Sequence, residues 1–151
     1  MRNHYHMLVS EKREGGLTTF LRKLNTGYTN YFNERYERSG VLFQGRTKKI
    51  LIKDDVHFLH ILNYIHLNPL DYMKGASDWR EKKISNVRAA LEHLDSYRWS
   101  SYRDYCGDNN FPSLIETDLF SDVFKNYKKE ITQYIKGIAS ELPETADLLL
   151  E

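Results

Sequence analysis

The chain has 151 residues, the size of one ordinary domain with a single hydrophobic core. Apolar residues make up 40% of it and charged residues 28%, a composition that excludes a disordered or a membrane-embedded protein. The net charge of +1 favours no class of partner by itself, and the single cysteine, Cys106, excludes an internal disulfide and is typical of the cytoplasm.

The predicted elements begin with a strand over 4–10, in which side chains alternate between two faces. A helix over 18–36 follows, because apolar residues recur there at spacings of three and four. Thr18 or Thr19 is expected to cap this helix.

Short extended segments are predicted at 41–43 and 48–53, around a glycine turn. Two aspartates then suit the start of a helix that runs from residue 55 to about Leu67. Pro69 is expected to end this helix, because it disfavours helical geometry at Asn68.

The rest of the chain is predicted to form shorter helices, over 84–94, 96–105, 118–126 and 127–140, before an acidic tail from residue 141. Helices with a few strands indicate an α+β fold, in which a small antiparallel sheet is packed with helices.

Charge is unevenly distributed along the chain. Between Arg35 and Lys53 there are six basic residues and one acidic residue, whereas the last segment from Glu141 has four acidic residues and no basic one. A basic middle segment can neutralise phosphates, which favours a nucleic-acid partner. A solvated charged surface has the same pattern, so both interpretations stay open.

Tyr64 is the first candidate functional residue. On a helix over 55–67 the core face consists of Phe58, Leu59, Ile61, Leu62 and Ile65. Tyr64 lies on the opposite side with His57 and His60, and Asn68 joins them if the helix reaches that far. Core packing therefore does not explain Tyr64, although an exposed tyrosine lying across the surface is the simpler alternative.

His4 and His6 form a His-x-His pair. On a strand both imidazoles share one face and can chelate one divalent cation. Asn68, one turn after Tyr64, could supply a carbonyl oxygen to the same cation. Such a pair is often incidental, and nothing in the sequence alone forces these residues together.

Four ordered stretches resemble the single-tyrosine (Y1) transposases of the IS200/IS605 class, and within them the REP-associated tyrosine transposases. The stretches are Asn3-His4-Tyr5-His6-Met7-Leu8-Val9, the segment from Tyr36 to Arg46, Tyr64-Ile65-His66-Leu67-Asn68-Pro69, and Tyr97-Arg98-Trp99-Ser100-Ser101-Tyr102. The resemblance covers about residues 2 to 105. It implies a transposase (HUH) domain over 1–105, followed by a helical extension with an acidic tail over 106–151.

The resemblance implies a ferredoxin-like HUH-nuclease fold and a homodimer that cuts and rejoins single-stranded DNA near hairpins. It assigns Tyr64 as the nucleophile that forms a 5′-phosphotyrosine, and His4, His6 and Asn68 as ligands of Mg²⁺ or Mn²⁺. His60 is an accessory candidate for activating the tyrosine. The residues expected to contact DNA are Arg38, Gln44, Arg46, Lys48 and Lys49. Such a protein is expected in the bacterial cytoplasm, at the nucleoid when bound to DNA.

Relatives of this kind normally have a strand, a helix and part of a further strand before the His-x-His motif. The resemblance therefore implies a fold without its first strand and helix. A truncated or domesticated relative that binds DNA hairpins without cutting is the alternative function. An unrelated metal hydrolase that uses His4, His6 and another histidine is a third.

Overall fold

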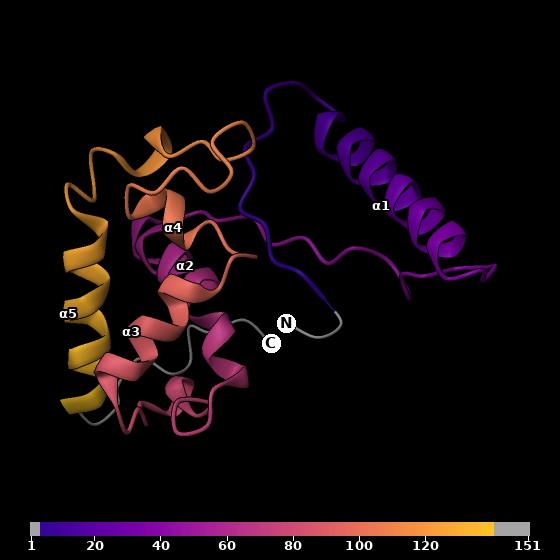
Figure 1. The fold of residues 1–151 in the computed structure, drawn as a ribbon. Helices are drawn as coiled ribbons and strands as arrows, with labels where there is room; N and C mark the ends of the chain where they lie inside the picture. Colours follow the sequence, from indigo (N-terminus) through magenta and orange to yellow (C-terminus); the bar gives the residue numbers. More distant parts are fainter. Residues whose placement is uncertain (1–3, 141–151) are drawn as a thin grey trace. The chain divides into compact units, whose positions relative to one another are not determined.

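The computed structural model of the protein describes residues 4–140, and its regular elements are helices. Figure 1 shows them in chain order: α1 (Gly16–Arg35), α2 (Asp55–Leu67), η1 (Asn68–Tyr72), η2 (Trp79–Glu81), α3 (Val87–Ser96), α4 (Tyr102–Tyr105), η3 (Asp118–Phe120) and α5 (Tyr127–Ser140). The elements marked η are short 3-10 helices. They belong to two compact units: the α1 unit, residues 7–51, and the helical body, residues 4–6 and 52–140.

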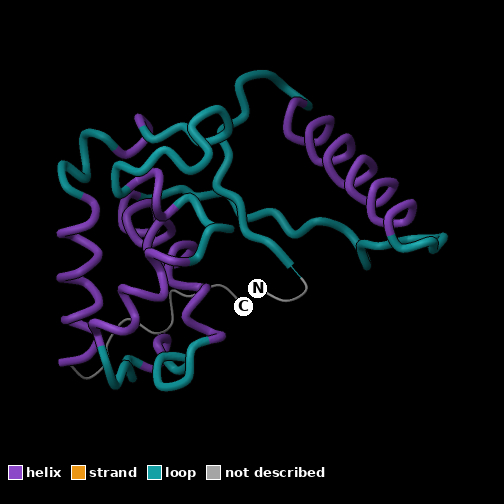
Figure 2. Tube along the Cα trace, in the orientation of Figure 1, coloured by secondary structure: helices purple, strands orange, loops and turns teal. Residues whose placement is uncertain are grey.

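The predicted α+β fold is wrong for the part of the chain that the structure describes. The segments 4–10, 41–43 and 48–53 are not strands, and Figure 2 draws them as loops. No segment within residues 4–140 pairs with another to make an antiparallel sheet. Alternating side chains predict which way residues face, but a strand also needs a neighbour to pair its backbone groups.

The long helices agree better with the predictions. The observed bounds of α2 and α5 match the helices predicted over 55–67 and 127–140. Helix α1 begins at residue 16, two residues before its predicted start. Asp54 caps α2, where its Oδ1 accepts a hydrogen bond from the His57 N–H at 2.7 Å. The predicted threonine cap of α1 is wrong, because Gly15 occupies the cap position with φ of 73°. Glycine adopts this left-handed backbone conformation readily.

The shorter helices are less regular than predicted. Asn86 caps α3 by accepting a hydrogen bond from the Ala89 N–H at 3.0 Å, so the helix begins three residues after the predicted start at 84. The helix predicted over 96–105 is limited to α4, and the helix predicted over 118–126 is limited to η3.

The helical path does not stop at Pro69. Asn68 has φ −52° and ψ −33°, helical values that the following proline was expected to disfavour, and the chain continues into η1. Pro69 lies in the first turn of η1, where its missing N–H leaves no hydrogen bond unmade. The continuation keeps Asn68 close to the last turn of α2.

The core of the helical body lies between α2, α3 and α5. Its fully or nearly fully buried side chains include Leu62 and Leu67 of α2, Ala90 and Leu94 of α3, and Ile131 and Ile135 of α5. The spacing of four between the two α5 isoleucines places both on the same side of that helix. This core holds the last turns of α2 in place.

The core face of α2 differs from the predicted one. Ile61 and Leu62 are buried as expected, but Leu59 is exposed, and the polar residues Asn63 and His66 are buried instead. Hydrophobic periodicity does not predict polar groups that are buried because they find partners inside.

The remaining expectations concern membrane-spanning helices, the acidic tail and the domain boundary. None of the helices within residues 4–140 is long and apolar enough to cross a membrane. The predicted acidic tail from residue 141 lies outside the described residues. The predicted domain boundary at residue 105 marks where the family resemblance ends, and α5, beyond that boundary, packs against α3 within the helical body.

Candidate functional site

Tyr64 is half-buried on the last turn of α2. Its ring centroid lies 5.4 Å from that of His6 and 5.9 Å from that of Trp79. The guanidinium carbon of Arg80 lies 5.4 Å from the centroid of the Tyr64 ring. The side chain therefore lies among polar and aromatic groups of the helical body and is not simply laid across a surface.

His4 and His6 lie together on the extended segment before the α1 unit. Their ring centroids are 5.2 Å apart and nearly perpendicular, with His4 exposed and His6 half-buried. Burial, then the neighbouring His4 and Arg80, lower the pKa of His6 below its usual value. The lowered pKa of His6 favours its neutral imidazole, the form that ligates metal ions.

Asn68 follows Tyr64 by four residues, and its side chain is buried. Its Nδ2–H donates to the Tyr64 carbonyl oxygen at 2.7 Å, which holds the amide against the end of α2. Its Oδ1 accepts a hydrogen bond from Arg80 Nη2 at 2.6 Å. The oxygen expected to ligate a metal is thus already bound to a cationic group.

Arg80 is the functional candidate that the sequence did not reveal. Besides Asn68, its guanidinium binds both carboxylate oxygens of Asp71, at 2.5 and 3.2 Å, and stacks 4.4 Å from the centroid of Trp79. Trp79 Nε1–H also donates to Asp71 at 2.8 Å. Burial opposes the charge, but hydrogen bonding and attraction to Asp71, and then to Tyr64, raise the pKa of Arg80. A positive charge is therefore fixed beside Tyr64.

No local pattern marks Arg80 in the sequence. It lies twelve residues after Asn68, on a 3-10 helix of three residues, so neither strand nor helix periodicity relates the two. The available signal is its place beside Trp79, since arginine stacks readily on aromatic faces.

His66, two residues after Tyr64, has a structural role. It is fully buried, and its Nδ1 and Nε2 lie 2.8 Å from the Tyr127 hydroxyl and 2.7 Å from Ser101 Oγ. The Tyr127 O–H donates to Asn63 Oδ1 at 3.0 Å, so the Tyr127 oxygen accepts from His66 Nδ1–H and Nε2 accepts from the Ser101 hydroxyl. Burial lowers the pKa of His66 to about 3, which keeps the ring neutral.

The accessory candidate His60 is half-buried on α2. Its ring lies 6.4 Å from the ring of Tyr134 on α5, measured between centroids. The contacts found around the Tyr64 ring are with His6, Trp79 and Arg80.

The predicted DNA-binding residues lie in the α1 unit, after α1 itself. All five are exposed: Arg38, Gln44, Arg46, Lys48 and Lys49. Lys49 Nζ donates to Thr18 Oγ1 at 3.3 Å, which connects the basic segment with the start of α1. Exposure of these side chains is a condition for the predicted contacts with DNA, and the contacts themselves stay a prediction.

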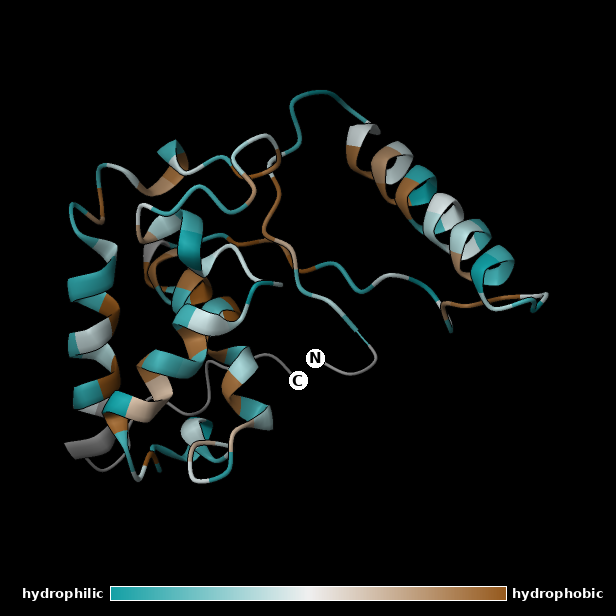
Figure 3. Cartoon of the chain, viewed as in Figure 1, coloured by the Kyte–Doolittle hydropathy of each residue, from teal (hydrophilic) through white to brown (hydrophobic). Residues whose placement is uncertain are grey.

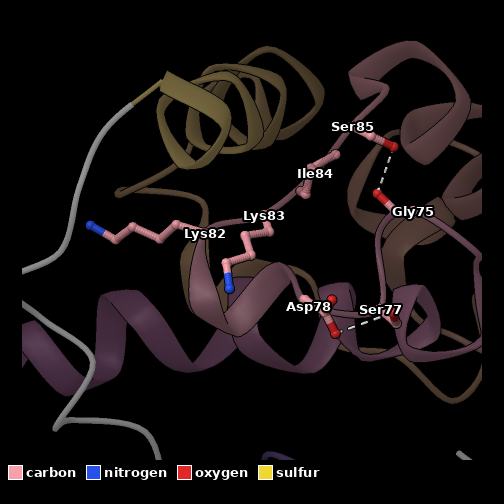
Figure 4. Close-up of a pocket in the computed structure, with 7 residues that line it drawn as sticks. All are labelled: Gly75, Ser77, Asp78, Lys82, Lys83, Ile84 and Ser85. Atoms are coloured by element: carbon pink, nitrogen blue, oxygen red, sulfur yellow. Dashed lines mark hydrogen bonds between the residues drawn. The ribbon is translucent and has the colours of Figure 1, made fainter.

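The other candidates for a site have simple explanations. Cys106 is half-buried, and burial raises the pKa of its thiol, which disfavours a nucleophilic thiolate. A surface pocket of about 420 Å³ lies beside η2, and Asp78, Lys82 and Lys83 are among the residues that line it (Figure 4). None of the predicted site residues lines this pocket.

A divalent cation fits only part of this arrangement of side chains. Within residues 4–140, no group of three or more His, Cys, Asp or Glu residues is placed to hold one metal ion. His4 and His6 supply two imidazoles close enough to bind the same ion. Asn68 could be a third ligand only if its Oδ1 bound the metal ion and Arg80 together. The part of the site that fits a metal ion is therefore the pair of His4 and His6.

Comparison of the chain with models of known protein families, with curated proteins and with solved structures finds no significant match. The resemblance to transposases therefore depends on the four sequence motifs alone.

Proposed function

We propose that this chain is a single-tyrosine transposase of the IS200/IS605 class, closest to the REP-associated tyrosine transposases. It would cut and rejoin single-stranded DNA near hairpins through a 5′-phosphotyrosine. The observation that carries the proposal is the position of Tyr64 next to His6 and Arg80, with Asn68 hydrogen-bonded to its backbone. The proposal depends on this cluster and the motifs, and not on the sheet of the HUH fold, which the described residues lack.

The chemistry follows from the residues around the tyrosine. The Tyr64 oxygen attacks the scissile phosphorus in line, its proton passes to water, and the bond from phosphorus to the 3′ oxygen breaks. The departing oxygen takes up a proton and becomes a 3′-hydroxyl, while the DNA 5′ phosphate stays on the tyrosine. Because the ester bond is exchanged and not hydrolysed, the strand can be rejoined by the reverse attack without a nucleotide cofactor.

Each neighbour has a role in this step. His4 and His6 would hold Mg²⁺ or Mn²⁺, which when bound polarises the phosphate. Arg80 holds the ring of Tyr64 and the amide of Asn68 in place, so that the nucleophile does not have to be ordered when DNA arrives. The exposed basic residues of the α1 unit would contact the DNA backbone. We expect the protein to act as a homodimer in the cytoplasm, at the nucleoid.

One observation favours a second candidate function, hairpin binding without cutting. Asn68 Oδ1 is held by Arg80 at 2.6 Å within a buried amide, so the third metal ligand is not ready in this arrangement. A relative that had lost its metal would keep the basic surface and lose the reaction.

A covalent-capture assay separates the two functions. The protein is incubated with Mn²⁺ and labelled single-stranded DNA that carries the hairpins flanking its own gene. We expect an adduct that survives a denaturing gel with the wild type and with Tyr134→Phe, a matched control on α5, but not with Tyr64→Phe. Hairpin binding without any adduct would support the binding-only function.

A further inference from the structure

Five aromatic rings form a continuous cluster in the α1 unit, which we name the α1 aromatic cluster: Tyr28, Tyr31, Phe32, Tyr36 and Phe43. Tyr28 lies at its centre, with ring centroids 6.3 Å from Tyr31, 6.1 Å from Phe32 and 6.1 Å from Phe43. Phe32 and Tyr36 are 4.5 Å apart. Spacings of three and four along α1 place Tyr28, Tyr31 and Phe32 along one side of the helix, and Tyr36 follows at its C-cap.

The tyrosines of this cluster are exposed. Tyr28 is 48% exposed, Tyr31 60% and Tyr36 62%, fractions far above those of core aromatics. Figure 3 shows that hydrophobic residues also recur along the first turns of α1. Within residues 7–51 only Leu21 is buried, so packing inside the α1 unit does not account for these rings.

The α1 unit is also the basic part of the protein. Residues 7–51 contain nine Lys and Arg residues against four Glu residues, whereas the rest of the chain has more acidic than basic residues. One of the cations touches the cluster directly, since the guanidinium carbon of Arg38 lies 5.5 Å from the centroid of Phe32. Exposed aromatic rings and a positive net charge therefore belong to the same unit of the chain.

The exposed rings and the positive charge together indicate which kind of ligand the α1 aromatic cluster binds. Two copies paired through this same surface would bring like charges together and repel each other, whereas single-stranded DNA brings phosphates for the cations and flat bases for the rings. We propose that the α1 aromatic cluster is a platform on which bases of single-stranded DNA stack, while the neighbouring lysines and arginines bind the backbone. The identity of the strand as DNA rests on the proposed function.

The test measures binding and not cutting, with the full chain carrying Tyr64→Phe. Two labelled strands of equal length are compared by fluorescence anisotropy, one of thymidine and one of abasic sites, which has the same charge but no bases. Tyr31→Leu should weaken binding of the thymidine strand by about 5- to 100-fold, the loss of one stacked base. It should leave binding of the abasic strand nearly unchanged, and Tyr31→Phe, which keeps the ring, should bind both strands as the parent does.

The matched control is Trp99→Leu in the helical body. Trp99 is 73% exposed and also has an arginine near its ring, since Arg98 Cζ lies 5.4 Å from its centroid. We expect this variant to bind both strands normally. A loss of binding equal to that of Tyr31→Leu would overturn the assignment to α1, and equal binding of thymidine and abasic strands by the parent would overturn stacking itself.

Sedimentation of the same variants tests the competing occupant. If Tyr31→Leu changes the oligomeric state and leaves strand binding intact, the cluster is an interface between copies and the proposal is wrong. An adduct at Tyr64 with strand binding insensitive to Tyr31 would overturn this inference alone. Strand binding that depends on Tyr31, without an adduct, would support the inference and overturn the cutting reaction.

Discussion

Arg80 connects three residues around Tyr64 through one guanidinium group. It donates to Asn68 Oδ1, pairs with the Asp71 carboxylate and lies over the aromatic rings of Tyr64 and Trp79. A planar group with several donors can satisfy such an arrangement, and a lysine ammonium cannot, because it lacks the fork geometry and the flat face. Arg80 is therefore a positioning residue for the candidate nucleophile.

We predict that Arg80→Lys lowers the free energy of unfolding by about 1–2 kcal/mol, because a part-buried charged hydrogen-bond network loses its geometry while the charge is retained. Arg88→Lys is the matched control, since Arg88 pairs with Glu92 on an exposed face of α3. That change should stay within about 0.5 kcal/mol. Urea unfolding of both variants measures the difference, and equal effects would show that Arg80 holds nothing in place.

The buried His66 makes stability depend on pH. Its pKa is about 3 in the folded protein and about 6.5 when unfolded, so between these values the unfolded chain binds one more proton. Stability is therefore complete above pH 6.5 and is lost progressively as the pH falls toward 3. From pH 6.5 to about pH 5 we predict a loss of about 1–2 kcal/mol from this residue, since half of the unfolded chains already bind the proton at pH 6.5.

The variant His66→Gln provides the control for this prediction. It should be less stable at neutral pH, because Tyr127 and Ser101 lose their partner, but its unfolding free energy should vary less between pH 6.5 and 5. Urea unfolding at several pH values measures both effects. An unchanged pH dependence in the variant would assign the effect to other groups.

At the scale of elements, α5 completes the core that supports α2. Its Tyr127, Ile131 and Ile135 recur every four residues, and all three are buried. Tyr127 also bonds to Asn63 and His66 of α2, so α5 contributes both apolar packing and polar partners to the helix that carries Tyr64. The segment after residue 105 is thus part of the support of the candidate site.

We predict that Ile135→Ala lowers the free energy of unfolding by about 2–5 kcal/mol, because it removes a fully buried side chain and leaves a cavity. Lys136→Ala is the neighbouring control, with an exposed side chain and an expected change within about 0.5 kcal/mol. Thermal unfolding followed by circular dichroism compares the two. Similar melting temperatures would mean that α5 is not part of the cooperative core.

At the scale of the whole molecule, the sequence predicted the long helices well and the sheet wrongly, for one reason. The bounds of α2 and α5 follow from local features, the Asp54 cap and the apolar spacing, which act within a few residues. A strand depends on a partner elsewhere in the chain, and the alternation in 4–10 carries no information about one. Pro69 was misjudged because a 3-10 turn accepts it where an α-helix would not.

The candidate site shows the same division. Tyr64 and Asn68 are four residues apart on one helical path, so their proximity could be predicted, and His4 with His6 likewise. The approach of His6 to Tyr64 was expected only from the family resemblance. The position of Arg80 beside Tyr64 could not be predicted, because its contacts depend on how η2 packs against the end of α2.

The most direct test of the proposed reaction is to locate the covalent link between protein and DNA. Protein trapped on labelled hairpin DNA with Mn²⁺ is digested, and the peptide that carries the nucleotide is sequenced by mass spectrometry. The proposed reaction predicts one modified residue, Tyr64, and no adduct in Tyr64→Phe. A nucleotide on another residue, or hairpin binding that never yields a covalent link, would contradict the assignment of Tyr64 as the nucleophile.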